Sequence, residues 1–224
     1  MRSFERLSYL LHENIPVYGN YVHLELERIN SISKGDTANK TFLKIDSHMG
    51  THLDFPYHFI NGGKKGEEYP AEFFVCHNAK VVEIDQDSGV IKMDKVKHLT
   101  PDAKLEFLMV KTGLCYKRDE RQYWEDNAGM HPDTAAFFRE LFPALRFFGF
   151  DSISMNAFQH RETGRQAHLE YLGREILIVE DMDLRNVSEQ TKFRNLIISP
   201  FLFEECDGAP CSIIAEVELE TGKQ

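Results

Sequence analysis

Residues 47–59 read SHMGTHLDFPYHF and form the most informative stretch of the sequence. When Thr41–Phe55 is read as one β-strand, its side chains alternate between two faces. The odd-numbered positions are then mostly apolar, while the even-numbered positions place His48, His52 and Asp54 on the opposite face. A helix fits less well, because at ~100° per residue it would turn the carboxylate away from the two histidines. The pattern therefore predicts a strand with one face in the core and one face bearing ionisable groups.

Two imidazoles and a carboxylate on one face are typical ligands of zinc, manganese or iron. Gly50 lies between the two histidines, and we expect its missing side chain to leave room for an ion. Such groups would cost several kcal/mol if they were buried without partners, which favours metal binding over a packing role. Three protein ligands leave positions open for water and substrate, as in catalytic rather than structural sites. Pro56 then ends regular strand pairing, and the following His58 is placed to overhang the site.

A second group of candidate ligands lies in residues 167–184, which read AHLEYLGREILIVEDMDL. His168 falls on an expected short helix, and Glu180 ends an apolar strand at the edge of the sheet. Taken alone, this pattern fits a metal ligand and a core strand meeting solvent equally well, so both interpretations stay open. The loop before His168 contains Gln159 and His160, which we expect to contact substrate.

The composition is that of a folded, acidic protein. Hydrophobic residues make up 42% and charged residues 28% of the 224 residues, and the formal net charge is −10. This charge argues against nucleic acid or an anionic membrane as a partner, since phosphate binding uses clustered Lys and Arg. No apolar run approaches the ~18 residues of a membrane span. The four cysteines lack a C-x-x-C pair and the N-terminus does not resemble a secretion signal, so we expect reduced thiols and a cytoplasmic protein.

Strand and helix patterns predict an α+β fold in a single domain over residues 1–224. Because the strands outnumber the helices and do not alternate with them, we expect a β-barrel-like mixed sheet with a few flanking helices rather than a doubly wound parallel sheet. Helices are expected after Pro132 and over Arg165–Leu172, where Gly173 would cap the end. The expected strands are Tyr21–Glu27, Thr41–Phe55, Ala79–Ile84, Leu105–Thr112, Leu145–Phe150, Glu175–Glu180 and Cys211–Leu219.

The sequence from His48 to His58 also resembles the signature of a known family. It matches the pattern H-x-G-T-H-x-D-x-P-x-H of the cyclase family, which includes bacterial kynurenine formamidases and isatin hydrolases. The similarity extends over most of the chain. It includes the strand ending at Val110–Gly113, His131-Pro132 before a helix, the stretch Phe148–Ser152, His168 and Glu180 at the family's spacing, and a D-G-x-P turn at Asp207–Pro210.

The resemblance implies the family's fold, a compact domain of the swivelling β/β/α type. It also implies a homo-oligomer (dimer or tetramer) and one or two divalent ions per chain, zinc being the first choice and manganese the second. It further implies that His48, His52 and Asp54 hold one ion, that His168 and Glu180 join Asp54 around a second with both carboxylates bridging, and that His58 is the general acid and base.

The activity that the resemblance implies is metal-dependent hydrolysis of a small amide, most directly arylformamidase action on N-formylkynurenine in tryptophan catabolism. This sequence departs from the family's pattern at two places, and both bear on which substrate it takes. Tyr18, which we expect to contact substrate, stands where kynurenine formamidases tend to carry a Trp, and Cys211-Ser212 follow the D-G-x-P turn where an Arg is common. The alternatives are a cyclic-amide or lactone hydrolase of the isatin hydrolase type and a non-catalytic metal- or ligand-binding protein with the same fold.

Overall fold

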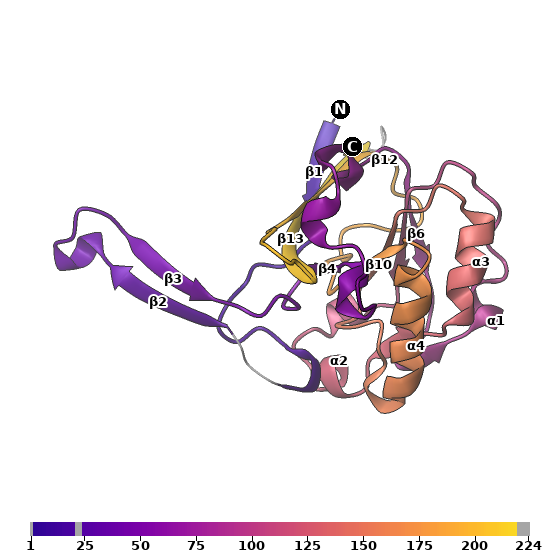
Figure 1. The fold of residues 1–224 in the computed structure, drawn as a ribbon, viewed down its shortest axis with the longest axis horizontal. Coiled ribbons are helices and arrows are strands. Elements are labelled where there is room, and N and C mark those ends of the chain that lie inside the picture. Colours follow the sequence, from indigo (N-terminus) through magenta and orange to yellow (C-terminus); the bar gives the residue numbers. More distant parts are fainter. Residues whose placement is uncertain (1, 21–23, 219–224) are drawn as a thin grey trace, which may run out of the picture.

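Nine strands form the largest sheet in the part of the chain that the structure describes, residues 2–20 and 24–218 of a computed structural model (Figure 1). One half of this sheet is parallel. Three of its strands are buried throughout, which explains why they read as nearly continuous apolar runs. In spatial order, the parallel half consists of β6 (Ala79–Glu83), β8 (Phe107–Lys111), β10 (Phe147–Phe150) and β11 (Leu177–Glu180).

The other half of the sheet is antiparallel and meets the parallel half at β4 (His52–Asp54). This short strand is fully buried and pairs antiparallel with β11 on one side and with β13 (Gly208–Glu218) on the other. The sheet curls so that β12 (Phe193–Pro200) approaches β6, which gives the sheet its barrel-like form. The remaining strands of this half are β5 (Val75–Cys76) and β1 (Arg2–Arg6).

Two helices, α3 (Asp133–Leu141) and α4 (Arg161–Leu172), cover one face of the parallel half (Figure 1). Phe138 of α3 and Tyr171 of α4 both contact Phe148 of β10, at ring-centroid distances of 6.1 and 5.0 Å. Burial of an aromatic or aliphatic side chain of this size contributes roughly 1.5–3 kcal/mol. This aromatic cluster therefore fixes α4, and the polar residues that it carries, against the sheet.

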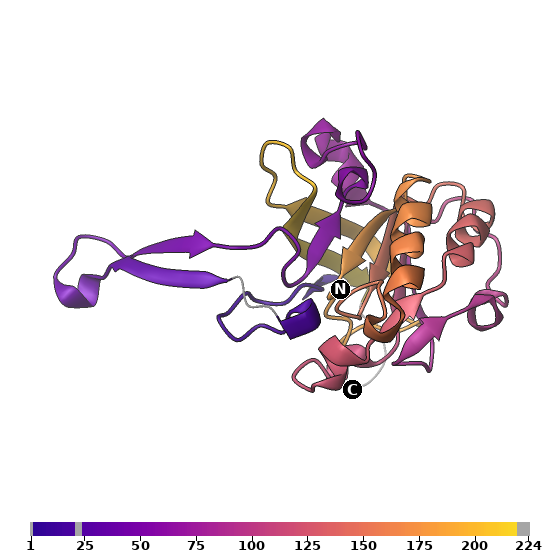
Figure 2. The ribbon, with the colours of Figure 1, turned by 60° about the horizontal axis from the view of Figure 1, so that its bottom comes forward.

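The remaining elements are small. A two-stranded arm, β2 (Glu25–Asn30) and β3 (Lys40–Lys44), projects away from the body (Figure 2). Another small sheet pairs β7 (Gly89–Ile91) with β9 (Ala128–Met130). Within the described residues, no helix is both long enough and apolar enough to cross a membrane. The short helices are α1 (Met93–Val96), α2 (Gln122–Glu125) and the 3₁₀ turns Tyr18–Asn20, Ile32–Lys34, Pro56–His58, Gly66–Glu68, Ala71–Phe74, Leu114–Tyr116 and Phe158–His160.

The predicted α+β class with a barrel-like sheet is confirmed. Four predicted strands correspond to β6, β8, β10 and β11, and the helix after Pro132 is α3. Helix α4 begins at Arg161 rather than Arg165, and it ends before Gly173 as expected. Strand β13 begins before Cys211, whereas β1, β5, β7, β9 and β12 were not predicted. Of the strand predicted from Tyr21, residues 21–23 lie outside the described residues, as does Leu219, and β2 begins at Glu25.

The prediction that Thr41–Phe55 forms a single strand is wrong. A turn that contains His48 separates β3 from β4. Asp46 Oδ1 accepts a hydrogen bond of 2.9 Å from the amide of His48, as an aspartate does when its side chain starts a turn. Gly50 then adopts a left-handed φ of 63°, which ends the simple alternation of side chains between two faces.

The predicted role of Gly50 is also wrong. A Cβ at this position would lie 2.7 Å from Leu11 Cδ2 and 3.0 Å from Ile15 Cδ1. The space that glycine leaves is therefore taken by apolar side chains, and the residue is needed for its backbone conformation and for this close packing.

Replacing Gly50 by alanine should lower the free energy of unfolding by about 2–5 kcal/mol, because the left-handed backbone costs about 1–2 kcal/mol and overpacking adds about 1–3 kcal/mol. Gly62→Ala is the matched control, since Gly62 has a φ of 72° but a Cβ there would meet nothing within 4 Å. Urea unfolding of both variants measures the difference. Equal losses would show that packing against Leu11 does not require glycine.

Candidate metal centre

Four ionisable side chains from three elements meet where the two halves of the sheet join. His52 and Asp54 come from β4, Glu180 ends β11, and His168 comes from α4. His52 and Glu180 are directly opposite in the β4–β11 register, so their side chains share one face of the sheet. None of the four side chains is more than 5% exposed.

The carboxylates of Asp54 and Glu180 lie between the two imidazoles. On one side, His52 Nε2 is 3.4 Å from Asp54 Oδ1 and 3.5 Å from Glu180 Oε2. On the other side, His168 Nε2 is 3.6 Å from Asp54 Oδ2 and 3.2 Å from Glu180 Oε1. Each carboxylate therefore presents one oxygen to each imidazole.

Backbone carbonyls orient both imidazoles. His52 Nδ1 lies 2.8 Å from the carbonyl oxygen of Gly50, and His168 Nδ1 lies 2.8 Å from that of Gly164. A proton on each Nδ1 is donated to the carbonyl, which leaves the lone pair of each Nε2 directed at the carboxylates. Metal-binding histidines are usually held in this way by a second hydrogen bond.

These donors fit a divalent metal ion. Two buried carboxylates so close together repel each other unless positive charge neutralises them. The nitrogen–oxygen separations of 3.2 to 3.6 Å are those expected of atoms that share an ion about 2.0–2.2 Å away. His52, Asp54 and Glu180 form one group of potential ligands, and His48, Asp54 and His58 form another.

His48 joins the cluster from the turn before β4. Its Nδ1 is 2.8 Å from Asp54 Oδ1, and its Nε2 is 2.9 Å from Asp207 Oδ2. A Cβ on Gly208 would lie 2.2 Å from His48 Cε1, so the glycine allows the ring to lie against β13. Burial opposes charge on His48, but the two carboxylates outweigh burial and raise its pKa to about 10. Conversely, although burial favours the neutral acid, His48 holds the pKa of Asp54 well below its usual range.

His58 lies over the cluster, in the turn that follows β4. Its ring stacks on that of His48 with centroids 3.7 Å apart, and its Nδ1 lies 3.7 Å from Asp207 Oδ2. Burial lowers the pKa of His58 to about 4, although the carboxylate of Asp54 opposes the shift. His58 is therefore neutral at pH 7 in this arrangement and can accept a proton.

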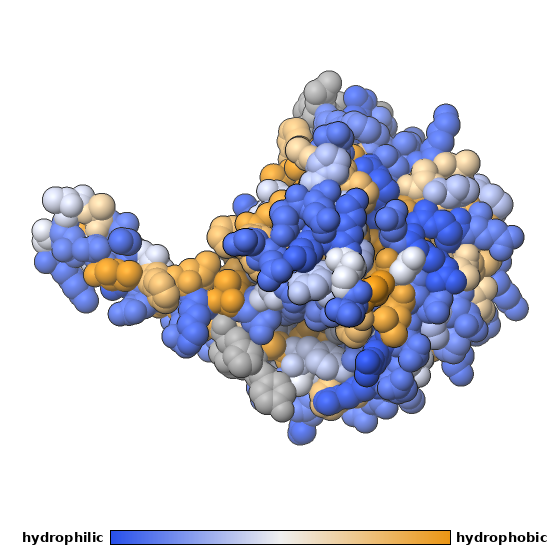
Figure 3. All heavy atoms as spheres, viewed as in Figure 1, coloured by the Kyte–Doolittle hydropathy of each residue, from blue (hydrophilic) through white to orange (hydrophobic). Residues whose placement is uncertain are grey.

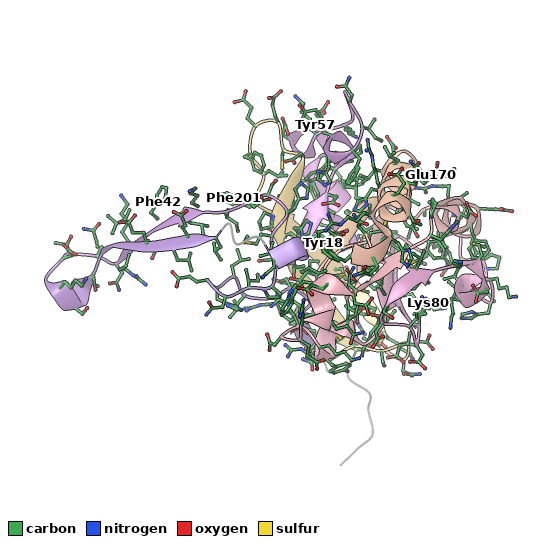
Figure 4. The ribbon with its side chains drawn as sticks, turned by 90° about the horizontal axis from the view of Figure 1, so that it is seen from below. Tyr18, Phe42, Tyr57, Lys80, Glu170 and Phe201 are labelled. Carbon is green, nitrogen blue, oxygen red and sulfur yellow. The ribbon has the colours of Figure 1, made fainter. Side chains whose placement is uncertain are left out.

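A cavity of about 230 Å³ borders the cluster. Tyr18 and Phe59 line this cavity, and Phe59 stacks on His168 with ring centroids 4.4 Å apart. Figure 4 shows Tyr18 between the projecting arm and the body. Gln159 and His160, which were predicted to contact substrate, are exposed and lie outside the residues that line the cavity.

Comparison with known proteins agrees with this geometry. A family model described as "Putative cyclase" matches residues 6–157. This chain belongs to the cyclase family. The kynurenine formamidase of Bacillus cereus is 26% identical over 205 residues, which cover 91% of this chain and 92% of that protein.

The fold is also that of solved cyclase-family structures. Isatin hydrolase A from Labrenzia aggregata has a TM-score of 0.80 at 21% identity, covering 96% of this chain and 94% of that one. A predicted metal-dependent hydrolase from Bacillus stearothermophilus has a TM-score of 0.75 at 20% identity, covering 96% of this chain and 98% of that one. Together these likenesses support a cyclase-family hydrolase.

Asp207 is part of this cyclase-family site, although it was not predicted as a site residue. Its carboxylate accepts a hydrogen bond from His48 Nε2 and lies beside the ring of His58. The hydrogen bond to His48 lowers the pKa of Asp207 against the effect of partial burial. The D-G-x-P turn was the available signal, because it placed an acidic residue at the start of β13.

Asp181 lines the same cavity and was also not predicted as a site residue. It follows Glu180 directly and has an unusual φ of 51°. Arg118 donates to it at 2.6 Å and the Tyr123 hydroxyl at 2.5 Å, and all three side chains are buried. A buried ion pair of this kind holds its residues in one geometry, because separating the charges would leave each of them unpaired. No local pattern could reveal it, since Arg118 and Asp181 meet only in the folded chain.

Asp54→Ala should empty the metal site, because Asp54 contacts His48, His52 and His168. Elemental analysis of protein purified without added metal should find about one or more divalent ions per wild-type chain, and less than about a tenth of that in the variant. Asp85→Ala, at an exposed position, serves as the control and should keep its metal. Full metal content in Asp54→Ala would exclude Asp54 as a ligand.

Proposed function

We propose that this chain is a metal-dependent hydrolase of a small aryl amide, with N-formylkynurenine as the leading substrate. The observation that carries the proposal is the pair of buried carboxylates, Asp54 and Glu180, shared between two imidazole Nε2 atoms. The likeness to the kynurenine formamidase of Bacillus cereus supports this choice of substrate. The products would be kynurenine and formate, in tryptophan catabolism. The unpaired, buried state of Cys76, Cys115, Cys206 and Cys211 agrees with a cytoplasmic setting.

Five residues would hold the metal. His48, His52 and Asp54 would hold one divalent ion, and His48 would lose the proton of one ring nitrogen on binding it. His168 and Glu180 would join Asp54 around a second. We expect zinc first and manganese second, since both accept imidazole and carboxylate ligands. The ion supplies a Lewis acid that polarises the amide carbonyl and lowers the pKa of water.

His58 would transfer the protons. Its Nδ1 lies 3.7 Å from Asp207 Oδ2, beyond hydrogen-bond distance, but the nearby carboxylate favours a proton on Nδ1 and so leaves Nε2 for the reaction. As water adds to the formyl carbon, neutral His58 accepts a proton from it. His58 then delivers that proton to the amine nitrogen as the carbon–nitrogen bond breaks, and the water oxygen leaves in formate.

The cavity walls suit a flat, mostly apolar substrate. Phe59 and Ile153 provide apolar surface close to the cluster, and Tyr18 lies at the wall nearest the arm. Tyr18 packs edge-on against Phe158 with ring centroids 5.5 Å apart, which fixes its ring. An aryl group placed among these side chains would exclude water from the reacting carbonyl.

The purified protein should hydrolyse N-formylkynurenine with a kcat/KM on the order of 10⁴ M⁻¹s⁻¹ or more. The activity should disappear after chelation and return with zinc or manganese, because the ion would supply the Lewis acid that polarises the amide carbonyl. Formation of the arylamine product is followed by absorbance. Turnover of isatin but not of N-formylkynurenine would favour a cyclic-amide hydrolase. Bound metal without turnover of either would favour a non-catalytic protein.

His58→Ala should reduce kcat by about 10²–10⁴-fold while the metal content stays at the wild-type level, because His58 moves protons and is not needed to hold the ion. His98→Ala is the control, since His98 is exposed and is not among the residues that line the cavity. Steady-state kinetics and elemental analysis on the same samples separate the two effects. Full activity in His58→Ala would refute the assigned role, and loss of metal would make His58 a ligand instead.

A further inference from the structure

Arg161 carries a positive charge that no carboxylate of the described chain neutralises. It is the first residue of α4, its side chain is exposed, and it forms no ion pair with any residue that the structure describes. Glu162, the acidic residue in the first turn of α4, instead accepts a hydrogen bond of 3.2 Å from Gln166. In a chain with a net charge of −10, a guanidinium without a carboxylate partner can bind an anion from outside.

Two aromatic rings hold this guanidinium in place. Its central carbon lies 4.3 Å from the ring centroid of Phe158 and 5.9 Å from that of Tyr18. The two rings pack edge-on against each other. Ring faces attract a cation but do not neutralise its charge. Arg161 therefore remains able to donate charge-assisted hydrogen bonds to a carboxylate.

The Tyr18 hydroxyl lies near the same charge. Tyr18 lines the cavity, and its hydroxyl oxygen is buried without a hydrogen bond to any described residue. Burial raises the pKa of Tyr18, and the guanidinium of Arg161 opposes this rise. A buried hydroxyl without a partner is unfavourable, so we expect a bound ligand to supply one.

Arg161 and His168 lie on the same face of α4. They are seven positions apart in one helix, so their side chains leave the helix axis within about 20° of the same direction. The rise between the two residues is about 10 Å. His168 reaches Asp54 and Glu180 at 3.6 and 3.2 Å. A ligand that extends from the metal centre to Arg161 is therefore longer than a simple amide, and an aryl amide with a short acidic side chain has this form.

The start of α4 is open to water. Residues 159–162 are exposed. Figure 3 shows hydrophilic residues over much of the body, whereas apolar surface follows the arm and the body next to it. A carboxylate that stays partly hydrated avoids most of the desolvation penalty of a buried charge.

We propose that Arg161, together with the Tyr18 hydroxyl, binds a carboxylate on the part of the substrate that points away from the metal centre. The inference rests on the proposed hydrolase function, and it narrows the substrates to aryl amides with an acidic side chain. N-formylkynurenine carries such a group, whereas a neutral cyclic amide such as isatin does not. Arg161 determines specificity in this proposal and takes no part in proton transfer.

Calorimetric titration of the metal-loaded full chain tests the contact without turnover. The ligands are L-kynurenine and its carboxamide, which has nearly the same shape but lacks the negative charge. Wild type should bind the acid at least about tenfold more tightly than the carboxamide, because hydrogen bonds between charged groups are the stronger ones. Arg161→Gln should lose this preference, while its dissociation constant for the carboxamide should stay at the wild-type value.

Two further variants serve as controls. Arg161→Lys should keep a preference of about threefold, because an ammonium supplies the charge without the paired donors of a guanidinium. Arg165→Gln removes the same charge from an exposed position one turn further along α4, and Arg165 lies over neither the Tyr18 ring nor the Phe158 ring. It should keep the wild-type preference.

Steady-state kinetics with N-formylkynurenine and its carboxamide make the same comparison during turnover. Arg161→Gln should raise KM for the acid at least about tenfold and leave kcat within about threefold, since the carboxylate contact is the same in the ground state and the transition state. The kinetic constants for the carboxamide should not change.

Three results would overturn the proposal. The first is a wild type that binds the acid no more tightly than the carboxamide, or that binds neither. The second is an equal loss of both ligands in Arg161→Gln, which would give Arg161 a structural role only. The third is an equal effect of Arg165→Gln, which would assign the preference to net charge.

The two proposals can fail separately. Preferential binding of the acid without hydrolysis of either formamide would contradict the proposed function and leave the carboxylate contact standing. Hydrolysis of both formamides with equal kcat/KM would support the hydrolase and contradict the contact.

Discussion

The burial of Asp54 beside Glu180 is the constraint on which the rest of the structure depends. Two carboxylates removed from water repel each other, and their charge must be met within the protein. His52 and His168 contact both carboxylates, and the backbone amide of Met155 donates to Glu180 at 2.5 Å. A strand of three residues is enough to build this arrangement, because β4 is held between β11 and β13 and has no freedom to shift its register.

The arm is connected along the chain to residues that line the cavity beside the metal centre. The segment that leaves the arm runs through the turn of His48 into β4, while Tyr18 lies just before the arm on its other side. Residues on both sides of the arm in the sequence, Tyr18 before it and His48 after it, therefore line the cavity.

The cluster and the cavity walls would contribute different properties to the proposed reaction. Imidazole and carboxylate ligands together with a proton-transferring histidine suit the hydrolysis of many amides and lactones. They do not distinguish an open-chain formamide from a cyclic amide. In the proposed function, that choice would depend on the shape of the cavity walls formed by Tyr18, Phe59 and Ile153.

The sequence alone was sufficient to bring four site residues together, because His48, His52, Asp54 and His58 lie within eleven positions and their spacing is local. It also indicated the class of sheet through the apolar runs of its buried strands. The break between β3 and β4 escaped prediction, since an Asp46 side chain that caps a turn competes with the strand pattern. Only the tertiary structure decided three other features. These are the pairing of His52 with Glu180, the contact of His48 with Asp207, and the projection of the arm. Each of these depends on backbone segments that are distant in sequence and are held together by burial in the common core.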